Sequence, residues 1–279
     1  MPSTPARFLI GLFALTVVCT LAFAQTSQKS SKPAIAPDAN LVNFQAIEFR
    51  RYTVKPGLRE PFAKYFDAYF PEAFEQLGAI AAGSFVERKN QNGFTWIRAF
   101  HTLDARAVAN AEFYYGPLWK EHRQRMNELL DDTDNVMLLR PLSPERGLTI
   151  LPAVDPVNEA TGAQGVVVAQ IFAVKPDSVD AFANAAELAF AKYQPTGARE
   201  AGVLVTLDVK NNFPQLPVRT DGPFLVWMGI LQDNQMLETK FTPVADAAAQ
   251  SLVATGLLRG SPELVVFDPT PRSRMRWLP

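Results

Sequence analysis

An internal repeat limits this chain to folds that are built from two similar halves. Val54-Lys55-Pro56 recurs as Val174-Lys175-Pro176, an offset of 120 residues, and Phe62-Ala63 recurs as Phe182-Ala183 at the same offset. Later segments keep their order with small slips, pairing 83–86 with 202–205, 94–100 with 224–230, and 135–141 with 263–269. We interpret the slips as loop insertions. The sequence therefore predicts two copies of one unit, over residues 41–145 and 160–270.

The first copy has the pattern of a β-α-β-β-α-β unit. Apolar residues spaced by three or four from Phe62 to Leu77 predict a helix, which Pro71 kinks, and Asn92-Gly93 predicts a hairpin turn. The predicted elements are, in order, strand 42–54, helix 62–77, strands 80–89 and 94–101, helices 104–113 and 117–130, and strand 135–142. The second copy repeats this order, with strands from 165, 203, 224 and 263 and helices over 177–193 and 235–255. This order is that of the ferredoxin-like unit.

The uncovered faces of the two sheets decide how the copies pack. Each unit has helices on one face of its sheet only, so the other face must be buried against something. Two copies in one chain can bury these faces against each other. We therefore predict an α+β fold of two tandem ferredoxin-like repeats, packed sheet to sheet as a barrel in which the repeats play the parts of two subunits.

The N-terminus predicts export. Met1 to Arg7 carries one positive charge, an apolar stretch follows from Phe8 to Phe23, and small residues precede Gln25. This layout is typical of a secretory signal peptide over 1–24, cleaved near Ala24. A retained anchor is the alternative, but the apolar run is shorter than the roughly 20 residues that span a bilayer. We expect a periplasmic or secreted protein with a flexible leader over 25–40.

Charge and composition exclude some partners. Without Arg7, the mature chain has 26 basic against 28 acidic residues, a net charge of −2, so no nucleic-acid partner is expected. No later segment is apolar enough to cross a membrane. The basic tail 271–279 could contact an anionic surface, but a frayed or packed strip is the commoner outcome for such a tail. Self-association stays open.

The first copy resembles a known family. The residues that carry the resemblance are the segment from Glu48 to Gly57 (EFRRYTVKPG), Phe62, Gly78, the hairpin at 92–93, Trp96, and the helix around Trp119. Together they are similar to a NIPSNAP domain. The resemblance implies a dimeric α/β-barrel fold, a group that also includes small monooxygenases and haem-binding relatives of chlorite dismutase. It implies no single activity, because this family has no established one.

A column of polar side chains is the main candidate site. Glu48, Arg50 and Tyr52 are two residues apart, so they project from one face of the first strand. Trp96 and Arg98 share a face of the third strand, which should neighbour the first. We expect these five side chains to form an ionic and aromatic cluster on or inside the barrel.

The second copy lacks this column. At the offset of 120 it has Val168, Gln170 and Phe172 in place of Glu48, Arg50 and Tyr52. At an offset of 130, Val226 and Met228 replace Trp96 and Arg98. One polar and one apolar half would let the barrel hold a small amphipathic molecule. A satisfied structural ion cluster is the alternative that needs no ligand.

The two histidines complete the candidate set. His101 is predicted at the end of the third strand, and His122 lies on a helix near Trp119. They have no metal-ligand spacing, so no metal and no cofactor is predicted. The resemblance to haem-binding relatives leaves a haem open, with His122 as its axial ligand.

Three functions follow from these observations. The first is a binding protein for a small organic molecule in the barrel. The second is a cofactor-poor, monooxygenase-like enzyme in which Tyr52, Trp96, Arg98 or His101 positions the substrate. The third is a structural protein with a filled barrel.

Overall fold

The computed structural model describes residues 39–41 and 43–278. The predicted signal peptide and nearly all of the predicted leader lie outside the described residues. The first described element is strand β1 (Ala39–Asn40), which pairs with β6 (Thr149–Ile150), so regular structure begins just before the predicted start at 41. In the described part of the chain, no helix is long and apolar enough to span a membrane.

The first repeat has the predicted element order. The helix predicted over 62–77 is divided just before Pro71, because a proline cannot continue the hydrogen-bonding pattern of a helix. Its elements are β2 (Ala46–Val54), α1 (Arg59–Tyr69), α2 (Pro71–Gln76), β3 (Ala79–Glu87), β4 (Gly93–Phe100), α3 (Leu103–Tyr115), α4 (Pro117–Leu129) and β5 (Leu130–Pro141). A 3-10 turn (Pro144–Arg146) and β6 lead to the second repeat.

The second repeat confirms the repeated order and adds one long insertion. Its elements are β7 (Val166–Ala173), α5 (Val179–Phe190), a 3-10 turn (Gln194–Thr196), β8 (Arg199–Thr206), β9 (Phe224–Leu231), α6 (Asn234–Met236), a π-helical turn (Leu237–Phe241), α7 (Thr242–Val253) and β10 (Glu263–Pro269). Residues 207–223 join β8 to β9, where the first repeat has only the short turn 88–92. We call residues 207–223 the insertion loop.

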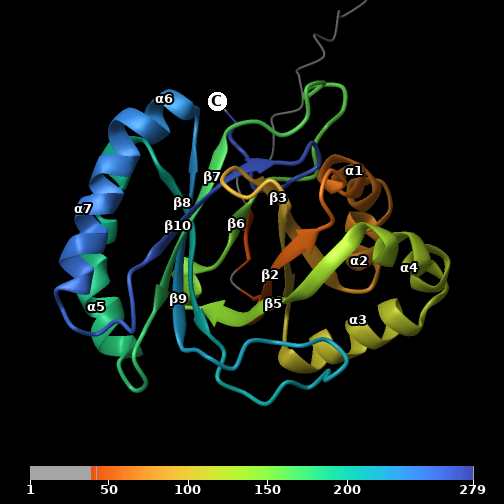
Figure 1. Cartoon of the computed structure of the whole chain (residues 1–279), viewed down its shortest axis with the longest axis horizontal. Helices are drawn as coiled ribbons and strands as arrows, with labels where there is room; N and C mark the ends of the chain where they lie inside the picture. The colour runs from red at the N-terminus through yellow and green to blue at the C-terminus, as the bar shows by residue number, and fades with distance from the viewer. Residues whose placement is uncertain (1–38, 42, 279) are drawn as a thin grey trace, which may run out of the picture. The chain divides into compact units, whose positions relative to one another are not determined.

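The eight long strands close into one antiparallel barrel in the order β10-β3-β4-β2-β5-β8-β9-β7. Two seams join the repeats, β5 with β8 and β10 with β3. Figure 1 shows α1 to α4 on one side of the strands and α5 to α7 on the other. The predicted sheet-to-sheet packing of two ferredoxin-like units is confirmed.

Three apolar cores follow from this arrangement. One fills the barrel with side chains from both sheets, among them Phe49, Met137, Ile171, Met228 and Phe267, all buried. The other two lie between each sheet and its own helices. Since alternate residues of a strand point to opposite faces, every strand supplies the barrel with one set and the helix layer with the other.

The C-terminal strip packs on the domain. Met275 is buried in the barrel core, and Arg272, Arg274 and Arg276 pair with Glu72, Glu75 and Glu159. The tail is therefore a packed strip in its described part, and its cations are occupied by intramolecular pairs.

Candidate functional site

The polar column does not face the barrel. Ile47 and Phe49 of β2 point into the barrel core, so Glu48, Arg50 and Tyr52 point the other way, beneath α1 to α4. The prediction of a barrel with one polar and one apolar half is wrong in this respect. The prediction failed because the two-residue period of a strand shows only which side chains share a face. It does not show whether that face points into the barrel or toward the helices.

The column forms one buried ion cluster around Glu48, together with an arginine that the sequence reasoning missed. The Glu48 carboxylate accepts from Arg50 Nη1 at 2.8 Å, from Arg98 Nε at 2.6 Å, and from Arg106 Nε at 2.6 Å. All four side chains are at most 1% exposed. Tyr52 accepts from Arg50 Nε at 2.9 Å. Arg98 lies directly across from Glu48 in the β2–β4 ladder, and Trp96 lies across from Arg50.

The charges of the cluster keep Glu48 ionised. Burial alone would raise the pKa of Glu48, but the adjacent charges of Arg98, Arg50 and Arg106 outweigh burial and hold that pKa far below its ordinary value. Burial lowers the pKa of Arg106. Burial also raises the pKa of Tyr52, so its hydroxyl stays neutral.

Arg106 of the cluster comes from α3, and Asn110 follows it one helical turn later. They lie four residues apart, on the buried stripe that Ala109 and Phe113 also occupy. The sequence did contain a signal for both residues, because each is a polar residue at a position of the helix where an apolar one is expected. Asn211 and Asn212 of the insertion loop accept from Arg106 Nη1 at 3.1 and 2.8 Å.

The second repeat has no arginine at the positions that correspond to Arg50 and Arg98. Gln170 stands where Arg50 stands, and it pairs across the ladder with Trp227, not with Val226. The third-strand offset is thus 131 residues, and the predicted offset of 130 is wrong by one. Trp227 corresponds to Trp96 and Gly229 to Arg98, whereas Val226 and Met228 face the barrel. A loop insertion of unknown exact length hides such a slip in the sequence.

The remaining predicted residues lie apart from the cluster. His101 is exposed and stacks on Phe44, with 4.0 Å between ring centroids. Trp119 is half-buried in the aromatic layer beneath the helices. His122 is buried, and its Nδ1 lies 2.6 Å from the Tyr65 hydroxyl.

Aromatic side chains surround His122. The Tyr69 ring is tilted by 33° to the imidazole, with centroids 4.2 Å apart, and Tyr65 and Phe70 pack edge-on against it. The Tyr65 hydroxyl engages Nδ1, so a haem iron could be bound only through Nε2, and His122 as an axial ligand stays a prediction. In the described residues, no group of three or more His, Cys, Asp or Glu side chains could hold a metal ion.

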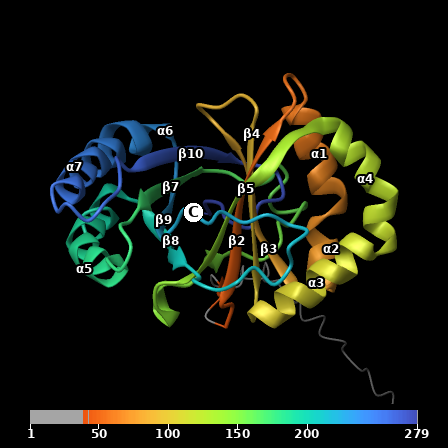
Figure 2. The ribbon, with the colours of Figure 1, turned by 60° about the horizontal axis from the view of Figure 1, so that its bottom comes forward.

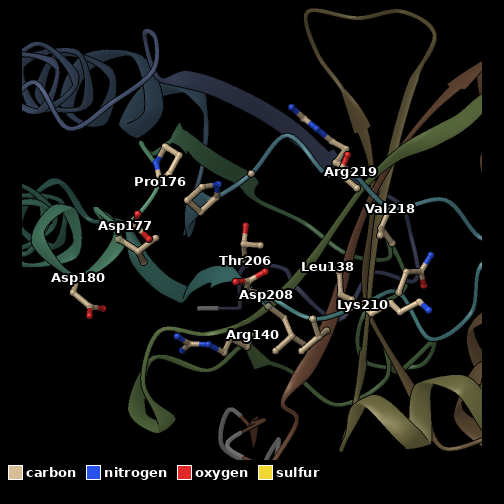
Figure 3. Close-up of a pocket in the computed structure, with 17 residues that line it drawn as sticks. Leu138, Arg140, Pro176, Asp177, Asp180, Thr206, Asp208, Lys210, Val218 and Arg219 are labelled. Atoms are coloured by element: carbon tan, nitrogen blue, oxygen red, sulfur yellow. The ribbon is translucent and has the colours of Figure 1, made fainter.

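An open groove lies on the outside of the β5–β8 seam, and we call it the seam groove. Its volume is about 670 Å³, within the range of small-molecule sites. Figure 3 shows Thr206, Asp208 and Leu138 between Asp177 on one side and Val218 on the other. The lining residues from the first repeat are Leu138 and Arg140, and the others come from the residues around the α5 N-terminus and from β8 and the insertion loop.

The insertion loop joins the groove to the ion cluster. It crosses from the second repeat over the first, as Figure 2 shows for the cyan segment. Arg219 N donates to Val136 O and Leu207 N to Leu138 O, which fixes the loop along β5. Asn211 lines the groove and also binds Arg106. The insertion loop therefore contacts both the seam groove and the ion cluster.

Part of the chain matches a known protein family. Residues 47–144 match the model of the NIPSNAP family. The match spans the first repeat from β2 to just beyond β5. It contains the whole ion cluster, whereas the seam groove takes most of its lining from the second repeat, outside the NIPSNAP match. No curated protein matches the chain in sequence.

Solved structures match the fold of both repeats. An anthrone oxidase-like protein is 15% identical, with a TM-score of 0.54 over 87% of this chain and 100% of that one. A "putative monooxygenase" from Lactobacillus acidophilus NCFM is 10% identical, with a TM-score of 0.52 over 84% and 98%. A protein of the same description from Fusobacterium nucleatum is 10% identical, with a TM-score of 0.54 over 84% and 96%. At such identities the likeness shows the fold alone.

Proposed function

We propose that this chain is an exported protein that binds a small amphipathic organic molecule in the seam groove. The carrying observation is a cavity of about 670 Å³ at a junction of the two repeats, in a barrel whose interior is occupied by its own side chains. We therefore propose the seam groove as the ligand site, in place of the barrel interior that the sequence predicted.

The lining of the groove favours an amphipathic ligand. Leu138, Leu207 and Val218 supply apolar contact, while Asp208 and Lys210 supply exposed charges of both signs at its rim. A site of this composition uses apolar surface for affinity and a few polar groups for orientation.

Filling the groove tests the proposal. Val218→Trp adds an indole to the groove wall, and Val157→Trp adds one to a loop position that is 84% exposed and lies outside the groove lining. The probe is 8-anilino-1-naphthalenesulfonate, an amphipathic anion, titrated by fluorescence. We expect saturable binding in the wild type and in Val157→Trp, and at least about tenfold weaker binding in Val218→Trp, since roughly 1.4 kcal/mol of lost contact is tenfold. Equal binding by all three would refute the groove as the site.

Export is part of the proposal and has its own test. The support is the three-part layout of residues 1–24, with small residues before Gln25. The intact mass of the protein from a periplasmic extract should correspond to a chain that begins at Gln25. A full-length mass in the membrane fraction would instead favour the retained anchor.

A monooxygenase-like activity is the second candidate, favoured by the structural likeness to an anthrone oxidase-like protein. Against it, Trp96 and Arg98 are buried beneath the helices and line neither the barrel core nor the seam groove. Oxygen uptake in the presence of anthrone tests this candidate directly, and a rate above that of buffer would support it.

A further inference from the structure

The ion cluster of the first repeat has an uncompensated charge. Three guanidinium groups surround a single carboxylate, and all four are buried. Among the described residues, Glu48 is the only carboxylate that forms an ion pair with Arg50, Arg98 or Arg106. Two positive charges therefore stay unbalanced in a medium where an unpaired charge is costly.

Arg98 and Arg106 each use only one of the two N–H groups on the guanidinium edge that faces Glu48, the edge formed by Nε and Nη2. Arg98 and Arg106 both donate through Nε to the carboxylate, and Nη2, on the same edge as Nε, has no partner among the described residues in either. Two other arginines of the described chain show this edge filled. Arg51 gives Nε and Nη2 to the two oxygens of Glu87, and Arg276 does the same with Glu159.

Two further donors in the same layer are buried without a partner. Trp96 Nε1 has none in the described part of the chain, and the Trp96 ring lies 5.0 Å from the Arg98 guanidinium carbon. The amide of Asn110, one helical turn after Arg106, has no partner on either atom within the described residues. The layer between β4 and the helices α2 and α3 thus holds four buried N–H donors and an excess of positive charge. Unpaired donors of this kind are rare in native interiors.

The second repeat is the internal control for this pattern. Its Trp227 donates Nε1 to Glu200 Oε2 at 2.9 Å, and Gln170 accepts from the Tyr193 hydroxyl and donates to Ala245 O. No charge stands at Gly229, where the first repeat has Arg98. The second repeat therefore satisfies its tryptophan and amide donors without a ligand, because the Glu200 carboxylate, which also pairs with Arg146, supplies the acceptor that Trp96 lacks among the described residues.

We propose that the layer between β4 and the helices α2 and α3 binds one small monovalent anion, of the size of chloride or formate. The anion accepts from Arg98 Nη2 and Arg106 Nη2, with Trp96 Nε1 and Asn110 Nδ2 as the neutral donors. An anion both completes the half-used edges and reduces the excess charge, whereas a water molecule does only the first. Asn211 and Asn212 close the layer toward solvent with neutral oxygens.

The test compares small and large anions at equal ionic strength. Sodium chloride, bromide and formate are the small probes, and sodium gluconate is the control, because gluconate is too large for a buried site. A ligand that binds only the folded state raises stability with the logarithm of its concentration above Kd. We expect the urea midpoint to rise with each small anion relative to gluconate. Superposed chloride and gluconate series would overturn the proposal.

Two tryptophan variants locate the effect without removing a charge. Trp96→Phe keeps an aromatic ring and removes only the unpartnered N–H, and we expect it to weaken apparent chloride affinity about tenfold, the usual worth of a hydrogen bond to a charged group. Trp227→Phe is the matched control in the second repeat, and its chloride dependence should equal that of the wild type. A crystal grown in bromide should show an anomalous peak beside Arg98 Nη2 and Arg106 Nη2. A water molecule there, without anomalous signal, would overturn the proposal.

Discussion

Trp227 holds in the second repeat the ladder position that Trp96 holds in the first, and only Trp227 has a hydrogen-bond partner for its indole N–H within the described residues. Each indole stacks on a phenylalanine of its own helix layer, Trp96 on Phe74 and Trp227 on Phe241. The two repeats therefore share an aromatic scaffold and differ in the charges placed next to it.

Gly229 shows what fills, in the second repeat, the space that the Arg98 side chain occupies in the first. The Trp227 ring lies where a Cβ on Gly229 would stand. We expect Gly229→Ala to displace this ring and to lower the free energy of unfolding by about 1–3 kcal/mol, the usual cost of overpacking a core. Urea unfolding followed by tryptophan fluorescence measures the effect.

Gly260→Ala is the control for that substitution, because no atom lies within 4 Å of a Cβ built there. Its unfolding curve should match that of the wild type. If Gly229→Ala were equally silent, the space beside the Trp227 ring would not be filled as described.

Glu48 is the only carboxylate among three arginines in the described layer, so its loss should be costly. We expect Glu48→Gln to lower the free energy of unfolding by about 3–5 kcal/mol, because it leaves the buried guanidinium groups without their counter-charge. Glu60→Gln breaks an exposed pair with Lys64 and should leave the urea midpoint unchanged. Equal stability of Glu48→Gln and wild type would contradict the cluster.

Acid should unfold the protein partly through Glu48. Burial is opposed and outweighed by the arginine charges, so the pKa of Glu48 in the folded chain lies below its ordinary value of 4.5. Below pH 4.5 the unfolded chain takes up a proton at residue 48 that the folded chain does not, so stability falls as the pH falls. We expect the urea midpoint of Glu48→Gln to fall less steeply from pH 5 to pH 3 than that of the wild type.

Asp67→Asn is the control for this pH series. Burial raises the pKa of Asp67, and hydrogen bonds from Thr270, the Arg272 backbone and Ser84 oppose that rise only in part. A raised pKa gives the opposite sign, so stability from this group is lost as the pH rises. Asp67→Asn should therefore keep an acid limb at least as steep as that of the wild type, and a flattened one would reverse the assignment.

The C-terminal strip should be needed for stability. Met275 is fully buried in the barrel core, so Met275→Ala should cost about 2–5 kcal/mol of unfolding free energy through lost contact and a cavity. Val253→Ala, at a position that is 44% exposed, should change the thermal midpoint little. A frayed tail would make the two variants alike in thermal melts.

The fold was largely readable from the sequence, because its local signals agree with one another. The apolar stripe from Phe62 to Leu77, the Asn92-Gly93 turn and the repeated Val-Lys-Pro segment each mark an element boundary or face. The order of strands at the seams was not readable, since β5–β8 and β10–β3 pairing depends on how the two sheets close.

The site was readable only in part, for two physical reasons. The alternation of Glu48 and Arg50 with Ile47 and Phe49 defines two faces, and only the packing of helices decides which one enters the barrel. Arg106 reaches Glu48 from 58 residues away on a helix, where strand periodicity carries no information. The groove depends on the insertion loop, where the first repeat has only the short turn 88–92.

Hydrogen exchange with and without a saturating amphipathic probe tests the central claim most directly, because it surveys the whole chain. The claim is that a ligand binds outside the barrel, in the seam groove. With 8-anilino-1-naphthalenesulfonate bound, the account predicts slower exchange in residues 206–223 and around 176–180, and unchanged exchange in β2 and β7. Protection confined to the barrel strands, with the insertion loop unaffected, would contradict it.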